Sequence, residues 1–202
     1  MDEETTVQAY RLAAFIASKH FEPATRKKPY YHMGATITDA VLQSGLNYKN
    51  VVYPRVQRLL RKYPSFKTTC SFLVLLQTVP PERLIGIRND RKLELIQELS
   101  WFLYENGVET ENDLVKWLYT EDNRHCLMCL NGIGPKTLDY LRMLSGYQAI
   151  AIDRHLFSFL KLAGIKADTY HEANRLYCMA AEFLHIGKCD LDQQVWEYMS
   201  KA

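Results

Sequence analysis

The chain has 202 residues, 48% of them hydrophobic and 24% charged, with a formal net charge of +2. This composition is that of a folded globular protein and excludes an intrinsically disordered chain. No apolar run is long enough to cross a bilayer, and the acidic, polar start differs from a signal peptide. We therefore expect an intracellular protein, in the cytoplasm, nucleoid or nucleus, without a membrane partner.

The charged residues are unevenly distributed along the chain. Between Glu22 and Glu82 the only acidic residue is Asp39, which lies among nine lysines and arginines. From Glu94 to Asp122 the balance is reversed. This asymmetry predicts one basic face able to meet phosphates, although ordinary solvated helix surfaces give the same pattern.

Apolar residues recur at helical spacing in nearly every segment, and no alternating strand pattern with paired turn glycines occurs. The first helices are predicted over residues 7–21 and 35–45, followed by a basic helix within 48–64 that either begins or bends at Pro54. Further helices are predicted over residues 66–78, 91–107 and 111–121. The sequence therefore indicates an all-α fold with short connections.

The stretch LNGIGPKT joins two apolar helices through a short glycine-rich turn. Gly132 and Gly134 permit unusual backbone angles and leave their N–H groups uncovered, and Pro135 suits the first position of a helix. Because a helix N-terminus favours anions, we predict that a DNA phosphate binds at Gly132, Ile133, Gly134 and Thr137. A tight turn without any ligand is the alternative.

This stretch resembles the helix-hairpin-helix motif of the superfamily of base-excision DNA glycosylases. In the bifunctional members, endonuclease III and the 8-oxoguanine glycosylases, a nucleophilic lysine opens the second hairpin helix and a catalytic aspartate follows. Here Lys136 holds the first position, and Asp153, seventeen residues later, holds the second. The resemblance implies a DNA glycosylase with AP lyase activity that removes 8-oxoguanine or an oxidised pyrimidine through a lysine Schiff base.

The chemistry of these two residues agrees with the resemblance. A free lysine has a pKa near ~10.4, so a nucleophilic amine needs an environment that disfavours its cation, such as a helix N-terminus or a partly desolvated cleft. The carboxylate of Asp153 can stabilise an oxocarbenium-like sugar or orient the amine. Each residue also has a simpler explanation, since Lys136 can be a surface phosphate contact and Asp153 the N-cap of the helix that follows.

The resemblance also implies the domain organisation and the partner. Residues 30–145 are expected to form a helical domain that carries the hairpin, residues 1–29 and 146–202 a second helical domain, and the active cleft lies between them. We expect a monomer that binds double-stranded DNA containing a damaged base. A non-catalytic DNA-binding hairpin protein and a monofunctional glycosylase that uses water remain alternatives.

The cysteines depart from one branch of the family. Endonuclease III holds an iron–sulfur cluster with four closely spaced cysteines near its C-terminus, where this chain has only Cys178 and Cys189. We therefore expect no cluster, no other metal and no cofactor. His125, Cys126 and Cys129 have metal-like spacing, but they lie in the apolar run HCLMCL, where we expect buried thiols.

Further DNA contacts are predicted in the basic part of the chain. Family members fill the gap left by the flipped base from the loop after an early helix, which makes Gln43, Asn47 and Tyr48 candidates. Asn47 can equally be the N-cap of the next helix. Arg55 and Arg58, on one side of that helix, are predicted phosphate contacts.

Four residues are left open by the sequence. Tyr30, Tyr31 and His32, near the expected domain junction, either line a base pocket or simply pack. The segment IAIDRH resembles the small archaeal-type 8-oxoguanine glycosylases, some of which use a C-terminal lysine. Lys201 has a matching position, although a lysine near a chain terminus is usually solvated.

Overall fold

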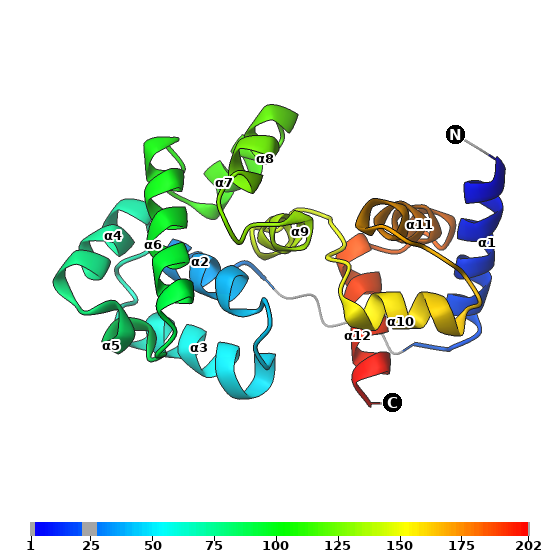
Figure 1. The fold of residues 1–202 in the computed structure, drawn as a ribbon, viewed down its shortest axis with the longest axis horizontal. Coiled ribbons are helices and arrows are strands. Elements are labelled where there is room, and N and C mark those ends of the chain that lie inside the picture. Colours follow the sequence, from blue (N-terminus) through cyan, green and yellow to red (C-terminus); the bar gives the residue numbers. More distant parts are fainter. Residues whose placement is uncertain (1–2, 22–27, 202) are drawn as a thin grey trace. The chain divides into compact units, whose positions relative to one another are not determined.

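A computed structural model describes residues 3–21 and 28–201 of the chain. These residues form twelve α-helices and one short π-helix, and none of them lies in a strand (Figure 1). The predicted all-α fold is confirmed. The chain divides into two compact units, Lys28–Tyr147 and Met1–Lys27 with Gln148–Ala202, which we call the hairpin unit and the terminal unit.

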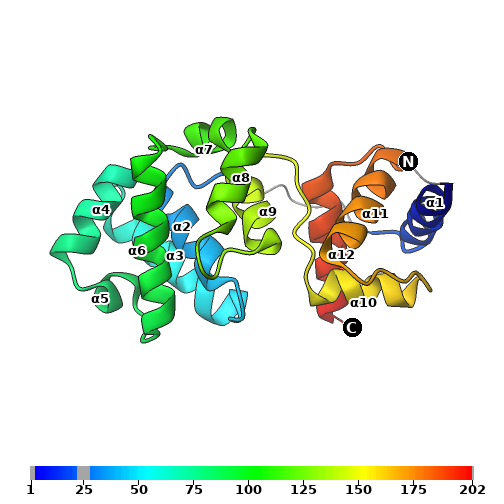
Figure 2. The same cartoon turned by 45° about the horizontal axis from the view of Figure 1, so that its top comes forward.

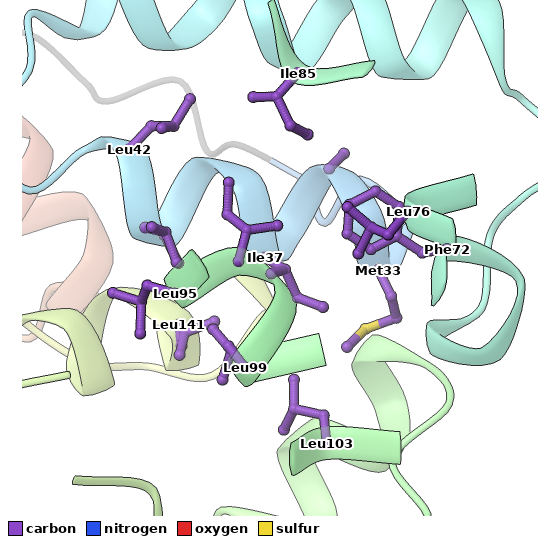
Figure 3. Packing of buried hydrophobic residues seen from close by; sticks show 14 of the residues in the cluster. Met33, Ile37, Leu42, Phe72, Leu76, Ile85, Leu95, Leu99, Leu103 and Leu141 are labelled. Carbon is purple, nitrogen blue, oxygen red and sulfur yellow. The ribbon is translucent and has the colours of Figure 1, made fainter. Parts of the chain in front are cut away.

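The hairpin unit is built around one central helix, α2, which is buried at every position. Figure 3 shows Leu95 and Leu99 of α6 and Leu141 of α9 gathered beside Ile37 of α2. In chain order its helices are α2 (Met33–Leu42), η1 (Tyr48–Val52), α3 (Tyr53–Lys62), α4 (Thr69–Thr78), α5 (Pro81–Ile85), α6 (Asp90–Glu105), α7 (Glu111–Trp117), α8 (Glu121–Met128) and α9 (Pro135–Leu144).

The N-terminus of α2 is held by buried polar contacts. The carboxylate of Glu111 accepts hydrogen bonds from the backbone N–H of His32 at 2.7 Å and from the hydroxyl of Thr36 at 2.8 Å. The His32 ring accepts a hydrogen bond from the N–H of Ala35 and contacts the carbonyl oxygen of Tyr63. His32 is therefore the buried N-cap of α2, whereas Tyr31 is exposed.

The terminal unit has its own core, formed by α1 (Glu3–Ala17), α10 (Arg154–Leu162), α11 (Tyr170–Phe183) and α12 (Lys188–Lys201). Helix α1 packs on α11, and α10 packs on α12. Tyr177 is fully buried in this core and donates a hydrogen bond of 2.8 Å to the carbonyl oxygen of Leu156.

Three local expectations need correction or refinement. Helix α1 occupies Glu3–Ala17 instead of residues 7–21, because two acidic residues suit its first turn and the chain turns at His20, with φ at +47°. The basic segment begins with the π-helix η1, and Pro54 lies in the first turn of α3, where its missing N–H is tolerated.

The cysteines of the run HCLMCL are the third correction. Cys126 and Cys129 are exposed, and Leu127 is the one buried residue of α8. A helix this short buries a narrow stripe, so apolar neighbours in sequence point in different directions.

Candidate functional site

The hairpin connects α8 to α9, two helices that lie side by side in Figures 1 and 2. The backbone of Gly132 is left-handed, with φ at +113°, and Gly134 is the extended N-cap of α9. Ile133 is buried between them, and its N–H donates to the carbonyl oxygen of Leu130. Among the residues that the structure describes, no side chain caps α9, and the first-turn N–H groups of Lys136 and Thr137 have no intrahelical partner.

Helix α6 supports the hairpin from one side. A Cβ atom on Gly132 would lie 2.8 Å from Cδ2 of Leu95, so α6 packs directly against the turn. The guanidinium of Arg91 donates a hydrogen bond of 2.9 Å to the carbonyl oxygen of Asn131. The conformation of the turn is therefore fixed by tertiary contacts as well as by its glycines.

Lys136 is the second residue of α9 and is partly buried. Within residues 3–21 and 28–201 its ammonium forms no hydrogen bond or ion pair. Lys92 of α6 is also partly buried, and its Nζ donates a hydrogen bond of 2.7 Å to the carbonyl oxygen of Val41. Burial, and then the nearby charge of Lys136, lower the pKa of Lys92. The two ammonium groups are thus close enough to repel each other.

A buried carboxylate belongs to the same part of the hairpin unit. Asp39 of α2 is completely buried and accepts hydrogen bonds from the hydroxyl of Tyr30 at 2.7 Å and from that of Tyr140 at 3.2 Å. Burial, and then the charge of Asp39, raise the pKa of both phenols. Tyr140 follows Lys136 by four residues on α9, so both side chains lie on one face of that helix.

Asp153, in the terminal unit, is the N-cap of α10. One carboxylate oxygen, Oδ1, accepts hydrogen bonds from the N–H groups of His155 at 2.8 Å and Leu156 at 3.1 Å. The other oxygen, Oδ2, accepts none from the part of the chain that the structure describes. Capping of α10 therefore uses only Oδ1, and Oδ2 can take part in another interaction.

The candidates for filling the gap in DNA lie close together in the chain after α2. Gln43 is the C-cap of α2 and is partly buried. Asn47 is exposed and caps η1, since its side chain accepts a hydrogen bond of 2.9 Å from the N–H of Asn50. Tyr48 packs beside Tyr53, with ring centroids 6.2 Å apart. That any of these three residues fills the gap left by a flipped base stays a prediction.

The two arginines of α3 that are predicted to bind phosphate also serve the fold. Arg55 donates to the carbonyl oxygens of Gly86 at 3.0 Å and Val51 at 2.7 Å. Arg58 donates to the carbonyl oxygen of Arg83 at 2.7 Å. The bonds to Gly86 and Arg83 hold α3 against α5. Contacts of the two arginines with DNA remain predictions.

Sequence reasoning missed three members of this site: Arg91, Lys92 and Asp39. A signal for Asp39 was present, because it is the only acidic residue in a long basic stretch and lies in an otherwise uncharged helix. No such signal marks Lys92, because its surroundings depend on α2 and α9, which are distant from it in sequence.

Among residues 3–21 and 28–201, no three His, Cys, Asp or Glu side chains are grouped so that they could hold a metal ion. Lys201 ends α12 and lines, with six other residues including Lys19 and Tyr198, a cavity of about 360 Å³ in the terminal unit. No helix in the described ranges has the length and apolar character needed to span a membrane.

Comparison with known proteins adds no assignment. No protein-family model matches the chain, and no curated protein sequence matches it either. What the site can do must therefore be inferred from its own residues and their geometry.

Proposed function

We propose that the protein is a base-excision DNA glycosylase with AP lyase activity, which removes an oxidised base from double-stranded DNA. One observation carries the proposal: directly after a Gly-Ile-Gly turn, a partly buried lysine stands in the first turn of a helix, and the described part of the chain supplies neither an ion pair to this lysine nor a side-chain cap to the helix. The uncapped N–H groups suit a DNA phosphate, and the lysine then lies next to the bound sugar–phosphate backbone.

The proposed reaction uses the amine of Lys136 as the nucleophile. The target nucleotide turns out of the duplex, at a cost of a few kcal/mol that is smallest for a damaged, poorly paired base. The amine attacks C1′ of the sugar, and the electron pair of the glycosidic bond leaves with the base, which takes up a proton. Loss of the amine proton and opening of the sugar ring give a Schiff base. Removal of a proton from C2′ then starts a β-elimination, in which the C3′–O bond breaks, the 3′ phosphate leaves and the strand is cut.

Asp153 serves this reaction through its unbonded oxygen. Positive charge develops on the sugar as the base departs, and a carboxylate stabilises such charge in a water-poor site. The N–H groups of α10 hold the other oxygen, so the side chain has a fixed orientation. The protein would act as a monomer inside the cell, without a metal or an organic cofactor.

The test is borohydride trapping on duplexes that carry 8-oxoguanine, thymine glycol or other oxidised pyrimidines. We expect a covalent protein–DNA adduct with at least one lesion, which Lys136→Ala abolishes. Lys116→Ala, which removes an exposed lysine of α7, is the matched control and should leave the adduct unchanged. An adduct that persists in Lys136→Ala would refute the assigned nucleophile.

The same experiment separates the alternative functions. Base release without any trapped adduct indicates a monofunctional glycosylase that uses water, with Lys136 acting only through its charge. Duplex binding that is unchanged by Asp153→Asn, without base release from any lesion, indicates a non-catalytic hairpin protein. Asp153→Asn tests the carboxylate directly, because its amide oxygen can still cap α10 but carries no charge.

A further inference from the structure

The end of α8 carries two thiols that the proposed reaction does not use. Cys126 lies in the last turn of the helix and Cys129 is its C-cap, and both side chains are exposed. Leu127, between them, faces the core instead. A free cysteine is usually one of the most buried residues of a protein, because its thiol behaves as a small apolar group. Two exposed cysteines within one turn therefore do not serve the core.

The backbone holds the two cysteines on the same side of the helix end. The N–H of Cys129 donates a hydrogen bond of 3.1 Å to the carbonyl oxygen of Cys126, and the N–H of Leu130 repeats this pattern to Leu127 at 3.2 Å. Bonds between residues three apart are those of a 3₁₀ turn, in which the side chains of such residues eclipse each other. The thiol of Cys129 donates to the carbonyl oxygen of His125 at 3.4 Å, so its sulfur points back along the turn that contains Cys126.

This arrangement is close to the geometry of a disulfide. The Cβ atoms of residues three apart on a helix are about 5–6 Å from each other, and a disulfide needs about 3.5–4.5 Å. The remaining approach is easiest at the end of a helix, where the last carbonyl groups have no intrahelical partner to lose. A bridge formed there is strained and exposed, so it is easily reduced again.

We propose that Cys126 and Cys129 form a redox-active dithiol site, which a low-molecular-weight disulfide such as oxidised glutathione converts into an intramolecular disulfide. One cysteine sulfur attacks a sulfur of the small disulfide and expels a thiolate, which gives a mixed disulfide. The second cysteine sulfur then attacks the first and expels the other small thiolate. The two cysteines lose two protons and two electrons, and the small disulfide becomes two thiols.

A metal ion is the other ligand class that a pair of thiols can take, and the surroundings of this pair do not favour it. Within the described ranges 3–21 and 28–201, no third His, Cys, Asp or Glu side chain joins the two cysteines in a group that could hold a metal. A structural zinc ion needs four ligands. The pair is therefore better suited to a reaction that needs two sulfurs and nothing else.

The test uses the whole folded protein in buffers with defined ratios of reduced and oxidised glutathione. Exchange is stopped with acid, the remaining thiols are alkylated, and trypsin releases both cysteines in one peptide, HCLMCLNGIGPK. At about 1 mM glutathione we expect a form of this peptide that has lost two hydrogen atoms and takes up no alkylating reagent, about tenfold more abundant than its glutathione adduct.

The dependence on glutathione identifies the bridge. The ratio of bridged to reduced peptide should fall with the square of the concentration of reduced glutathione, because two molecules are released. Cys70, an exposed thiol on α4, is the matched reference and should form only a glutathione adduct, whose ratio falls in simple proportion. A peptide that carries glutathione but never loses two hydrogen atoms would overturn the inference.

Two variants assign the reaction to this pair. Cys129→Ser should replace the bridge by a glutathione adduct at Cys126, because no second thiol displaces the glutathione. Cys70→Ser should leave the bridged fraction unchanged, and a bridge that disappears in this variant would overturn the inference. Since no step involves DNA, the result is independent of whether Lys136 forms a borohydride-trapped adduct.

Discussion

At the scale of single residues, buried phenols show how strongly the fold controls ionisation. Tyr30 and Tyr140 donate hydrogen bonds to the completely buried carboxylate of Asp39, and Tyr177 donates to a carbonyl oxygen in the other unit. Burial is the first cause that raises the pKa of all three phenols, and nearby carboxylates are the second. At alkaline pH these phenols therefore keep their protons in the folded protein, whereas the unfolded chain releases them.

This difference predicts alkaline unfolding. Because the folded pKa of each phenol lies above the unfolded value, its stabilising effect is complete below about pH 10 and is lost as the pH rises further. We expect the free energy of unfolding to fall by about 1.4 kcal/mol per pH unit for each such phenol. Urea unfolding from about pH 9 to pH 11.5, followed by circular dichroism, measures this slope.

A matched pair of variants assigns the effect to its source. Tyr140→Phe should make the slope of the unfolding free energy against pH shallower by the share of one phenol, about 1.4 kcal/mol per pH unit. Tyr119→Phe, at a position that is 80% exposed, should leave this slope unchanged. Equal slopes in the two variants would show that Tyr140 ionises normally in the folded protein.

At the scale of elements, the two glycines of the hairpin have different reasons to be glycine. Gly132 has φ at +113° and no room for a Cβ beside Leu95, whereas Gly134 has φ at −101° and no atom within 4 Å of such a Cβ. We expect Gly132→Ala to lower the free energy of unfolding by about 1–3 kcal/mol and Gly134→Ala to change it by less than about 0.5 kcal/mol. Thermal unfolding of both variants measures the difference.

Gly134→Ala has a second use, because Gly134 is the N-cap of α9 and the added methyl group lies next to the N–H groups that are proposed to bind a phosphate. Under the proposed function its duplex affinity, measured by fluorescence anisotropy, should fall by about tenfold, which corresponds to about 1.4 kcal/mol. Wild-type affinity in this stable variant would speak against phosphate binding at the hairpin.

The elements also show what a sequence can and cannot reveal. The helical class could be predicted because buried leucines and isoleucines recur at helical spacing, and the turn between α8 and α9 because glycine and proline have specific backbone roles. The exposure of Cys126 and the contact of Lys92 with Val41 could not, since each depends on how separate helices pack. For the same reason the buried partners of Asp39 could not be read from its neighbours in sequence.

At the scale of the whole molecule, the described residues form two hydrophobic cores that share no member. Every residue of the first core lies between Met33 and Leu141, in one continuous segment. The second core combines α1 with residues from Ile150 to Val195. The hairpin unit is therefore continuous in sequence, whereas the terminal unit is assembled from both ends of the chain.

This difference predicts how isolated fragments behave. A fragment of residues 28–147 keeps its whole core and should unfold cooperatively, with dispersed amide resonances in NMR spectra. A fragment of residues 148–202 lacks Leu12 and Ile16 of α1, which are buried in its core, so it should remain unfolded or molten until a peptide of residues 1–21 is added. A native-like fragment 148–202 without that peptide would show that α1 contributes little to the terminal core.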